Sequence, residues 1–137
     1  MMQANFLDKT ERAARNRAVL LAMGAVIVPV TAFLRTTDTS AFAEGAGWVL
    51  MIAAWSIVLA TGGGLMLNRR MRGMLNDELS VANRGRAIGW GFFAMIATSA
   101  VLLLVPHLVP DAAGAIRFVS GAGLTVAMAR YALLEWQ

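Results

Sequence analysis

The chain has 137 residues, of which 58% are apolar and 15% are charged, and the charges are concentrated between long apolar runs, a composition typical of integral membrane proteins. It contains no cysteine and one histidine, which excludes disulfides, cysteine-ligated zinc, iron–sulfur clusters and haem held by two histidines of one chain. The net charge of +4 comes mostly from arginines beside the apolar runs, so we expect anionic lipid headgroups as the counter-charge and no nucleic acid as a partner.

The first apolar run covers residues 18–34 and follows a basic N-terminal segment. The spacing of the charges in that segment, which includes Arg15 and Arg17, predicts an amphipathic lead-in to the first membrane helix. A cleaved signal peptide is the alternative, because residues 41–43 resemble a small-residue cleavage site. The length of the apolar run and the charged residues before that site favour a retained membrane helix.

The second apolar run covers residues 46–67 and contains three consecutive glycines, Gly62, Gly63 and Gly64, near its inner end. Glycines in a membrane helix predict close packing against a neighbouring helix, and a hinge is the alternative. A phosphate-binding loop is excluded, because the run before the glycines has a helical pattern and no Gly-Lys-Ser/Thr follows them.

The longest polar interval, residues 68–88, separates two apolar halves of similar length. We expect a helix to begin near Asp77 and to continue without a break into the third apolar run, residues 87–105. At 1.5 Å per residue this helix would be about 43 Å long, so its first two turns should stand in the cytoplasm as a linker helix. Gly85 and Gly89 are four residues apart on it, a spacing that permits close approach of another helix.

The fourth apolar run covers residues 112–134 and contains Arg117 and Arg130. Each arginine is one or two turns from an end of the run, so both side chains are expected to extend to lipid headgroups. Gly121 and Gly123 in the same run are predicted packing positions.

His107 lies between two prolines in the connection between the third and fourth runs. A histidine in such a loop is expected to be an interfacial surface residue, and a proton switch or metal ligand is the less favoured alternative. No three residues of the sequence form a recognisable metal-ligand set, so no metal site is predicted.

The two halves open with the same pattern. Residues 15–19 read Arg-Asn-Arg-Ala-Val and residues 84–88 read Arg-Gly-Arg-Ala-Ile, an offset of 69 residues at which many alanines and glycines also match. We therefore predict an all-α membrane protein with four transmembrane helices, built as a tandem repeat of two helical hairpins, residues 1–68 and residues 69–137. An even number of spans in each repeat gives the hairpins the same orientation, related by an axis along the membrane normal.

Most basic residues lie on one side of the predicted membrane. Ten of the twelve belong to the N-terminal segment, the central polar interval and the C-terminal end, which leaves Arg35 and Arg117 on the other side. The positive-inside rule then places both termini in the cytoplasm. We expect a multi-pass protein of the bacterial inner membrane.

The predicted spans contain no Asp, Glu or Lys, and no residue set combines a nucleophile with a base, so we expect no enzymatic activity and no cofactor. The preferred hypothesis is a small inner-membrane protein that acts through helix packing as a non-catalytic subunit or an accessory or assembly factor, in a homo-oligomer or a larger membrane complex. The alternative is a small anion channel or transporter with Arg117 on the pathway. The residues expected to contact anionic headgroups or an anion are Arg15, Arg17, Arg84, Arg86, Arg117 and Arg130.

Overall fold

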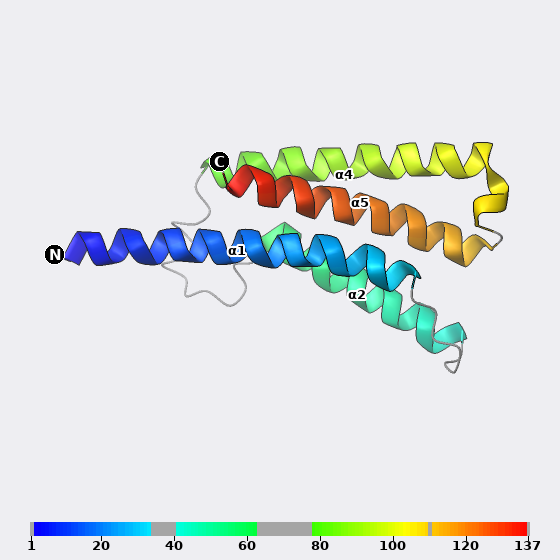
Figure 1. Ribbon diagram of the computed structural model, residues 1–137, viewed down its shortest axis with the longest axis horizontal. Coiled ribbons are helices and arrows are strands. Elements are labelled where there is room, and N and C mark those ends of the chain that lie inside the picture. The colour runs from blue at the N-terminus through cyan, green and yellow to red at the C-terminus, as the bar shows by residue number, and fades with distance from the viewer. Residues whose placement is uncertain (1, 34–40, 63–77, 110, 137) are drawn as a thin grey trace.

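The computed structural model describes residues 2–33, 41–62, 78–109 and 111–136, and every regular element in these ranges is helical (Figure 1). The elements are α1 (Met2–Phe33), α2 (Ala41–Thr61), α4 (Glu78–Leu104), the 3-10 turn η2 (Pro106–Leu108) and α5 (Ala112–Glu135). The predicted all-α class is confirmed.

Each of the four α-helices contains a stretch that is long and apolar enough to cross a membrane. The stretches are Ala14–Ala32, Phe42–Thr61, Leu79–Leu104 and Ala112–Glu135. A membrane span needs about 20 mostly apolar residues, so the prediction of four membrane-spanning helices is confirmed at the level of length and composition.

The end of α2 differs from the expected second span. The apolar run suggested a helix to residue 67, whereas α2 ends at Thr61, and the next residue, Gly62, has φ +61°. Only glycine adopts this left-handed conformation without a steric penalty, and it is a common way to end a helix. Gly62 therefore terminates the helix instead of lying within it. Gly63 and Gly64 lie outside the described residues.

The boundaries of the later helices agree more closely with the sequence. α4 begins at Glu78 and continues without a break through the third apolar run to Leu104; Asp77, the expected start, lies outside the described residues. α5 begins after Asp111, whose side chain accepts a hydrogen bond from the backbone N–H of Gly114. Such a cap satisfies one of the free N–H groups of the first turn.

α5 is the central helix of the bundle (Figure 1). α4 lies along one side of it and α1 along another, whereas α2 approaches its backbone less closely. We call one end of the bundle the terminal end, because both chain termini lie on that side. α1 and α4 start there, and α2 and α5 finish there. The first turns of α1 extend past the other helices there. The buried apolar residues are Ala18, Leu21, Val28, Leu59, Ala87, Leu124, Ala127, Met128, Tyr131 and Ala132.

Glycines allow the helices to approach α5 closely. A Cβ on Gly91 of α4 would lie 2.6 Å from the carbonyl oxygen of Gly123 on α5, and a Cβ on Gly24 of α1 would lie 2.6 Å from the ring of Trp55 and 2.9 Å from the sulfur of Met128. Because lipid offers no hydrophobic contrast between helices, close van der Waals packing of this kind is a main source of their association.

Candidate functional site: a buried polar cluster and an apolar groove

A buried arginine occupies the core at the terminal end. Arg17, Leu21 and Val28 are spaced by four and seven residues on α1, so they share one helix face, and all three are buried. The side chain of Arg17 is 8% exposed and that of Glu135, in the last turn of α5, is 7% exposed. Burial of a charge at this depth requires a partner.

Arg17 contacts three other helical segments through its guanidinium group. Its Nη2 donates to Glu135 Oε2, which forms an ion pair, and to Ser80 Oγ of α4 at 3.2 Å. Its Nη1 donates to the carbonyl oxygen of Gly62 at 3.4 Å, at the end of α2. One side chain of α1 thus bonds to the ends of α2, α4 and α5.

Ser80 and Tyr131 complete the cluster. Ser80 Oγ lies 3.1 Å from Glu135 Oε1, to which it donates, and 3.0 Å from the hydroxyl of Tyr131. The Tyr131 side chain is fully buried, and the Arg17 guanidinium carbon lies 5.5 Å from the centroid of its ring, within the range of a cation–π contact. The positive charge of Arg17 and the negative charge of Glu135 are therefore paired with each other and with neighbouring polar groups of the same chain.

A second ion pair lies toward the opposite end of the bundle. Arg117 Nη1 donates to Glu44 Oε1 at 2.6 Å, with the two side chains 16% and 25% exposed. Beside it, Trp48 Nε1 donates to Ser120 Oγ at 3.2 Å. Both contacts join α2 to α5. Arg117 was expected to extend to headgroups or to face an anion pathway, and the structure gives it a carboxylate partner within the chain.

The other basic candidates have different surroundings. Arg15 and Arg86 are exposed. Arg130 is exposed, with its guanidinium carbon 5.9 Å from the centroid of the Trp90 ring. Arg84 is partly buried, and its Nη1 lies 3.7 Å from the position that a Cβ on Gly62 would take. The structure thus brings Arg17 and Arg84 to the end of α2 and leaves the rest apart.

His107 is exposed in the short 3-10 turn η2 between α4 and α5. Within the described ranges, no group of three or more His, Cys, Asp or Glu side chains could hold a metal ion.

The predicted packing glycines divide into two sets. Gly123 lies against α4, where a Cβ would meet Met95, and Gly121 has space for a Cβ at ordinary contact distance from Trp48, 3.5 Å. A Cβ on Gly85 or Gly89 would meet nothing within 4 Å. Gly85 and Gly89 therefore make no close helix contact within the described chain.

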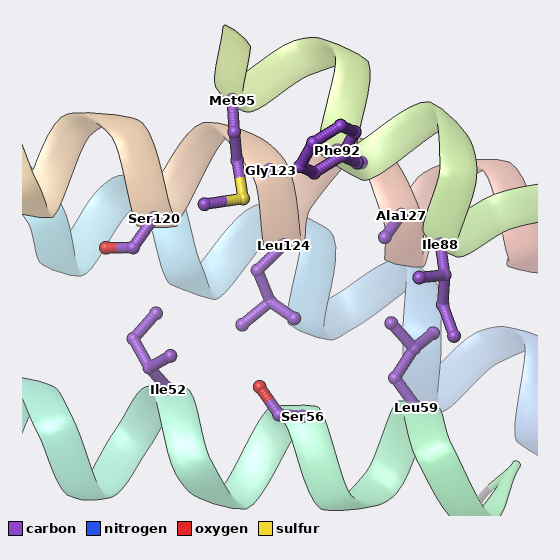
Figure 2. Close-up of a pocket in the computed structure, with 11 residues that line it drawn as sticks. Ile52, Ser56, Leu59, Ile88, Phe92, Met95, Ser120, Gly123, Leu124 and Ala127 are labelled. Atoms are coloured by element: carbon purple, nitrogen blue, oxygen red, sulfur yellow. The ribbon is translucent and has the colours of Figure 1, made fainter. Parts of the chain in front are cut away.

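An apolar groove runs between α2 and α4, with α5 as its floor (Figure 2). Ile52, Ser56 and Leu59 point into it from α2 toward the facing helices. Its volume is about 280 Å³. A second hollow of about 540 Å³ between α4 and α5 shares Met95 and Ser120 with it, so the two form one tract along the bundle. The remaining lining residues of the groove are Ile88, Gly91, Phe92, Gly123, Leu124 and Ala127.

Sequence reasoning missed most of the polar cluster. Glu135 lies just beyond the apolar run of residues 112–134, so the run does not mark it as a buried charge, and Ser80 and Tyr131 belong to no recognisable motif. One signal was available: Tyr131 and Glu135 are four residues apart, hence on one face of a helix. Gly91, where a Cβ would lie 2.6 Å from the carbonyl oxygen of Gly123, is not part of the four-residue spacing of Gly85 and Gly89 that predicts helix packing.

No protein-family model, curated protein or solved structure matches this chain. The fold and the sites above are therefore the basis for a functional assignment.

Proposed function

We propose that this protein is a non-catalytic subunit or assembly factor of the membrane, which works by packing its helices against a partner membrane protein or further copies of itself. The site chemistry supports a structural role. The two ion pairs, Arg17 with Glu135 and Arg117 with Glu44, are used to join helices of the chain. A charge that is already paired and buried is a poor candidate for binding a transported ion or a substrate.

The observation that carries the proposal is the open face of α4. Gly85, Gly89, Ile96 and Leu103 recur at spacings of four and seven residues and so lie on one face. Ile96 is 51% exposed and Leu103 82% exposed, and both glycines leave room for a neighbouring backbone. Small residues followed by large apolar ones on one helix face are typical of helix–helix interfaces in membranes. Gly91 packs against α5 from another face of α4, so this open face is available to a second molecule.

The proposed arrangement in the membrane follows the charge distribution. We place the terminal end, with both termini, in the cytoplasm of a bacterial inner membrane, because the basic residues gather there. The recurrence of residues 15–19 as residues 84–88 supports an origin by tandem duplication of a hairpin. A single cysteine placed at exposed Ala82 should react with a membrane-impermeant maleimide only after permeabilisation, and one at His107 should react in intact cells. The reverse pattern would contradict this orientation.

An anion pathway through Arg117 is not part of the proposal. Arg117 is paired with Glu44 at 2.6 Å, and this carboxylate would repel an anion at the same place. The hydroxyl of Ser120 is also engaged, as it donates to the carbonyl of Ile116 at 2.7 Å and accepts from Trp48.

The proposal is tested by the size of the assembly in mild detergent, measured by native gel electrophoresis and mass photometry. We expect the unmodified protein to migrate as a discrete species larger than one chain, and Gly89→Leu to release the single chain. Gly45→Leu is the matched control, because a Cβ on Gly45 also meets nothing within 4 Å but lies on α2. A protein that is a single chain before substitution, or that assembles equally with Gly89→Leu, would refute the proposal.

A further inference from the structure

The groove between α2 and α4 is open to its side and apolar along its length. Three of its wall residues on α4 remain exposed although they line it: Ile88 by 46%, Phe92 by 61% and Met95 by 37%. α2 and α4 both rest on α5 and make few close backbone approaches to each other. In a membrane-spanning bundle such a groove faces hydrocarbon, so an acyl chain can enter it from the bilayer without crossing a polar barrier.

One end of the groove carries a positive charge. Arg84 precedes the groove residue Ile88 by one helical turn, and Gly62 follows the groove residue Leu59 by about one turn. The Arg84 Nη1 lies 3.7 Å from the Cβ position on Gly62, so its guanidinium stands where the groove reaches the terminal end. Arg84 forms no ion pair with any described residue. The nearby Arg17, in contrast, is neutralised by Glu135.

The distance along α4 from this charge to Met95, the last groove residue on that helix, matches the thickness of one leaflet of a bilayer. Met95 lies eleven positions after Arg84 on α4, a rise of about 17 Å. Half of a hydrocarbon core of roughly 30 Å is about 15 Å. Arg84 is thus placed at headgroup level when Met95 is near the bilayer midplane.

We infer that the groove binds one phospholipid with an anionic headgroup, with an acyl chain between α2 and α4 and the phosphate on Arg84. A guanidinium matches a phosphate in shape and can donate two parallel hydrogen bonds. An anionic headgroup is favoured over a zwitterionic one because no described carboxylate pairs with Arg84, so a net positive charge remains at the groove mouth. The inference does not depend on the proposed function.

The inference is tested by native mass spectrometry of the delipidated full chain after titration with phosphatidylglycerol or with phosphatidylcholine. We expect one retained phosphatidylglycerol per chain and several-fold weaker retention of phosphatidylcholine. Arg84→Gln should lower phosphatidylglycerol retention about tenfold, as expected for loss of hydrogen bonds to a charged group. Arg86→Gln is the control, because Arg86 is exposed and lies two residues, or about 200°, around the same helix from Arg84. Any headgroup that Arg86 contacts belongs to lipid outside the groove, so Arg86→Gln should leave the one retained lipid unchanged.

A second pair of variants tests the position of the acyl chain. Ser56→Phe fills the groove from α2, whereas Ala54→Phe adds the same side chain at an exposed position that does not line it. Only Ser56→Phe should reduce retention. Equal retention of both lipids, equal effects of Arg84→Gln and Arg86→Gln, or retention that survives Ser56→Phe would each overturn the inference. So would a dimer that retains no lipid and crosslinks through a cysteine at position 56, because a second copy would then occupy the groove.

Discussion

The Arg17–Glu135 pair gives the sharpest test of how this bundle is held together. Replacing Arg17 with methionine leaves the Glu135 carboxylate buried without its cation, and replacing Glu135 with leucine leaves the guanidinium without its anion. Loss of one partner from a buried pair costs about 3–5 kcal/mol in the free energy of unfolding. Three kcal/mol corresponds to a change of about 100-fold in the ratio of folded to unfolded protein.

The double variant shows whether Arg17 and Glu135 stabilise the protein as a coupled pair or as two independent side chains. If the two groups mainly compensate each other's burial, removing both should cost far less than the sum of the single changes, because two apolar side chains of similar volume replace the pair. We expect Arg17→Met with Glu135→Leu to be at least about 2 kcal/mol more stable than either single variant. Arg15→Met is the matched control, since Arg15 is exposed on the same helix, and it should change stability by less than about 0.5 kcal/mol.

The assay is reversible unfolding in mixed micelles with increasing dodecyl sulfate, followed by far-ultraviolet circular dichroism. The free energy of unfolding of the four proteins then forms a double-mutant cycle. The reasoning would be refuted by an Arg17→Met variant as stable as Arg15→Met, or by a double variant whose loss equals the sum of the single losses. Either result would mean that the cluster does not hold the helices together as a coupled unit.

Three further outcomes follow from the helix contacts. Gly91→Leu should destabilise the chain by about 1–3 kcal/mol in the same assay, because its Cβ would overlap the carbonyl of Gly123, whereas Gly85→Leu, with open surroundings, should not. Gly62→Ala should cost about 1–2 kcal/mol because of its left-handed φ of +61°, and a neutral result would refute this helix stop. Proteoliposomes that contain either the unmodified protein or Arg117→Leu should show the same chloride flux as protein-free liposomes. A chloride flux that is present in the unmodified protein and lost in Arg117→Leu would support the anion-pathway hypothesis instead.

The sequence was sufficient to predict the helices, because each membrane span is a long apolar run whose length is fixed by the bilayer. The start of α4 is also predictable, since the helix begins at Glu78, one residue after Asp77, near which the sequence predicts the linker helix to begin. The end of α2 was not, because the apolar pattern continues past Gly62 and only the backbone angle of that residue shows the stop.

The buried polar cluster around Arg17 is harder to predict from the sequence than the helices are. Its members come from four segments, and Arg17 and Glu135 are 118 residues apart in the chain. Charge patterning placed Arg17 beside the lipid headgroups because Arg15 and Arg17 look equivalent in the sequence. Their burial differs because a helix rotates by 100° per residue, so side chains two positions apart point in nearly opposite directions. Knowledge of which helix faces α5 is needed to distinguish them.

Contact between the open face of α4 and another protein is the most direct test of the proposed role. A photoreactive benzoylphenylalanine at Ile96 should yield one discrete protein adduct when membranes are irradiated, because Ile96 lies on the face of Gly85 and Gly89. The same group at Leu133, which is 52% exposed on α5, should yield mainly lipid adducts. An Ile96 variant that gives only lipid adducts, or the same protein adducts as the Leu133 variant, would contradict a role in helix packing with a partner.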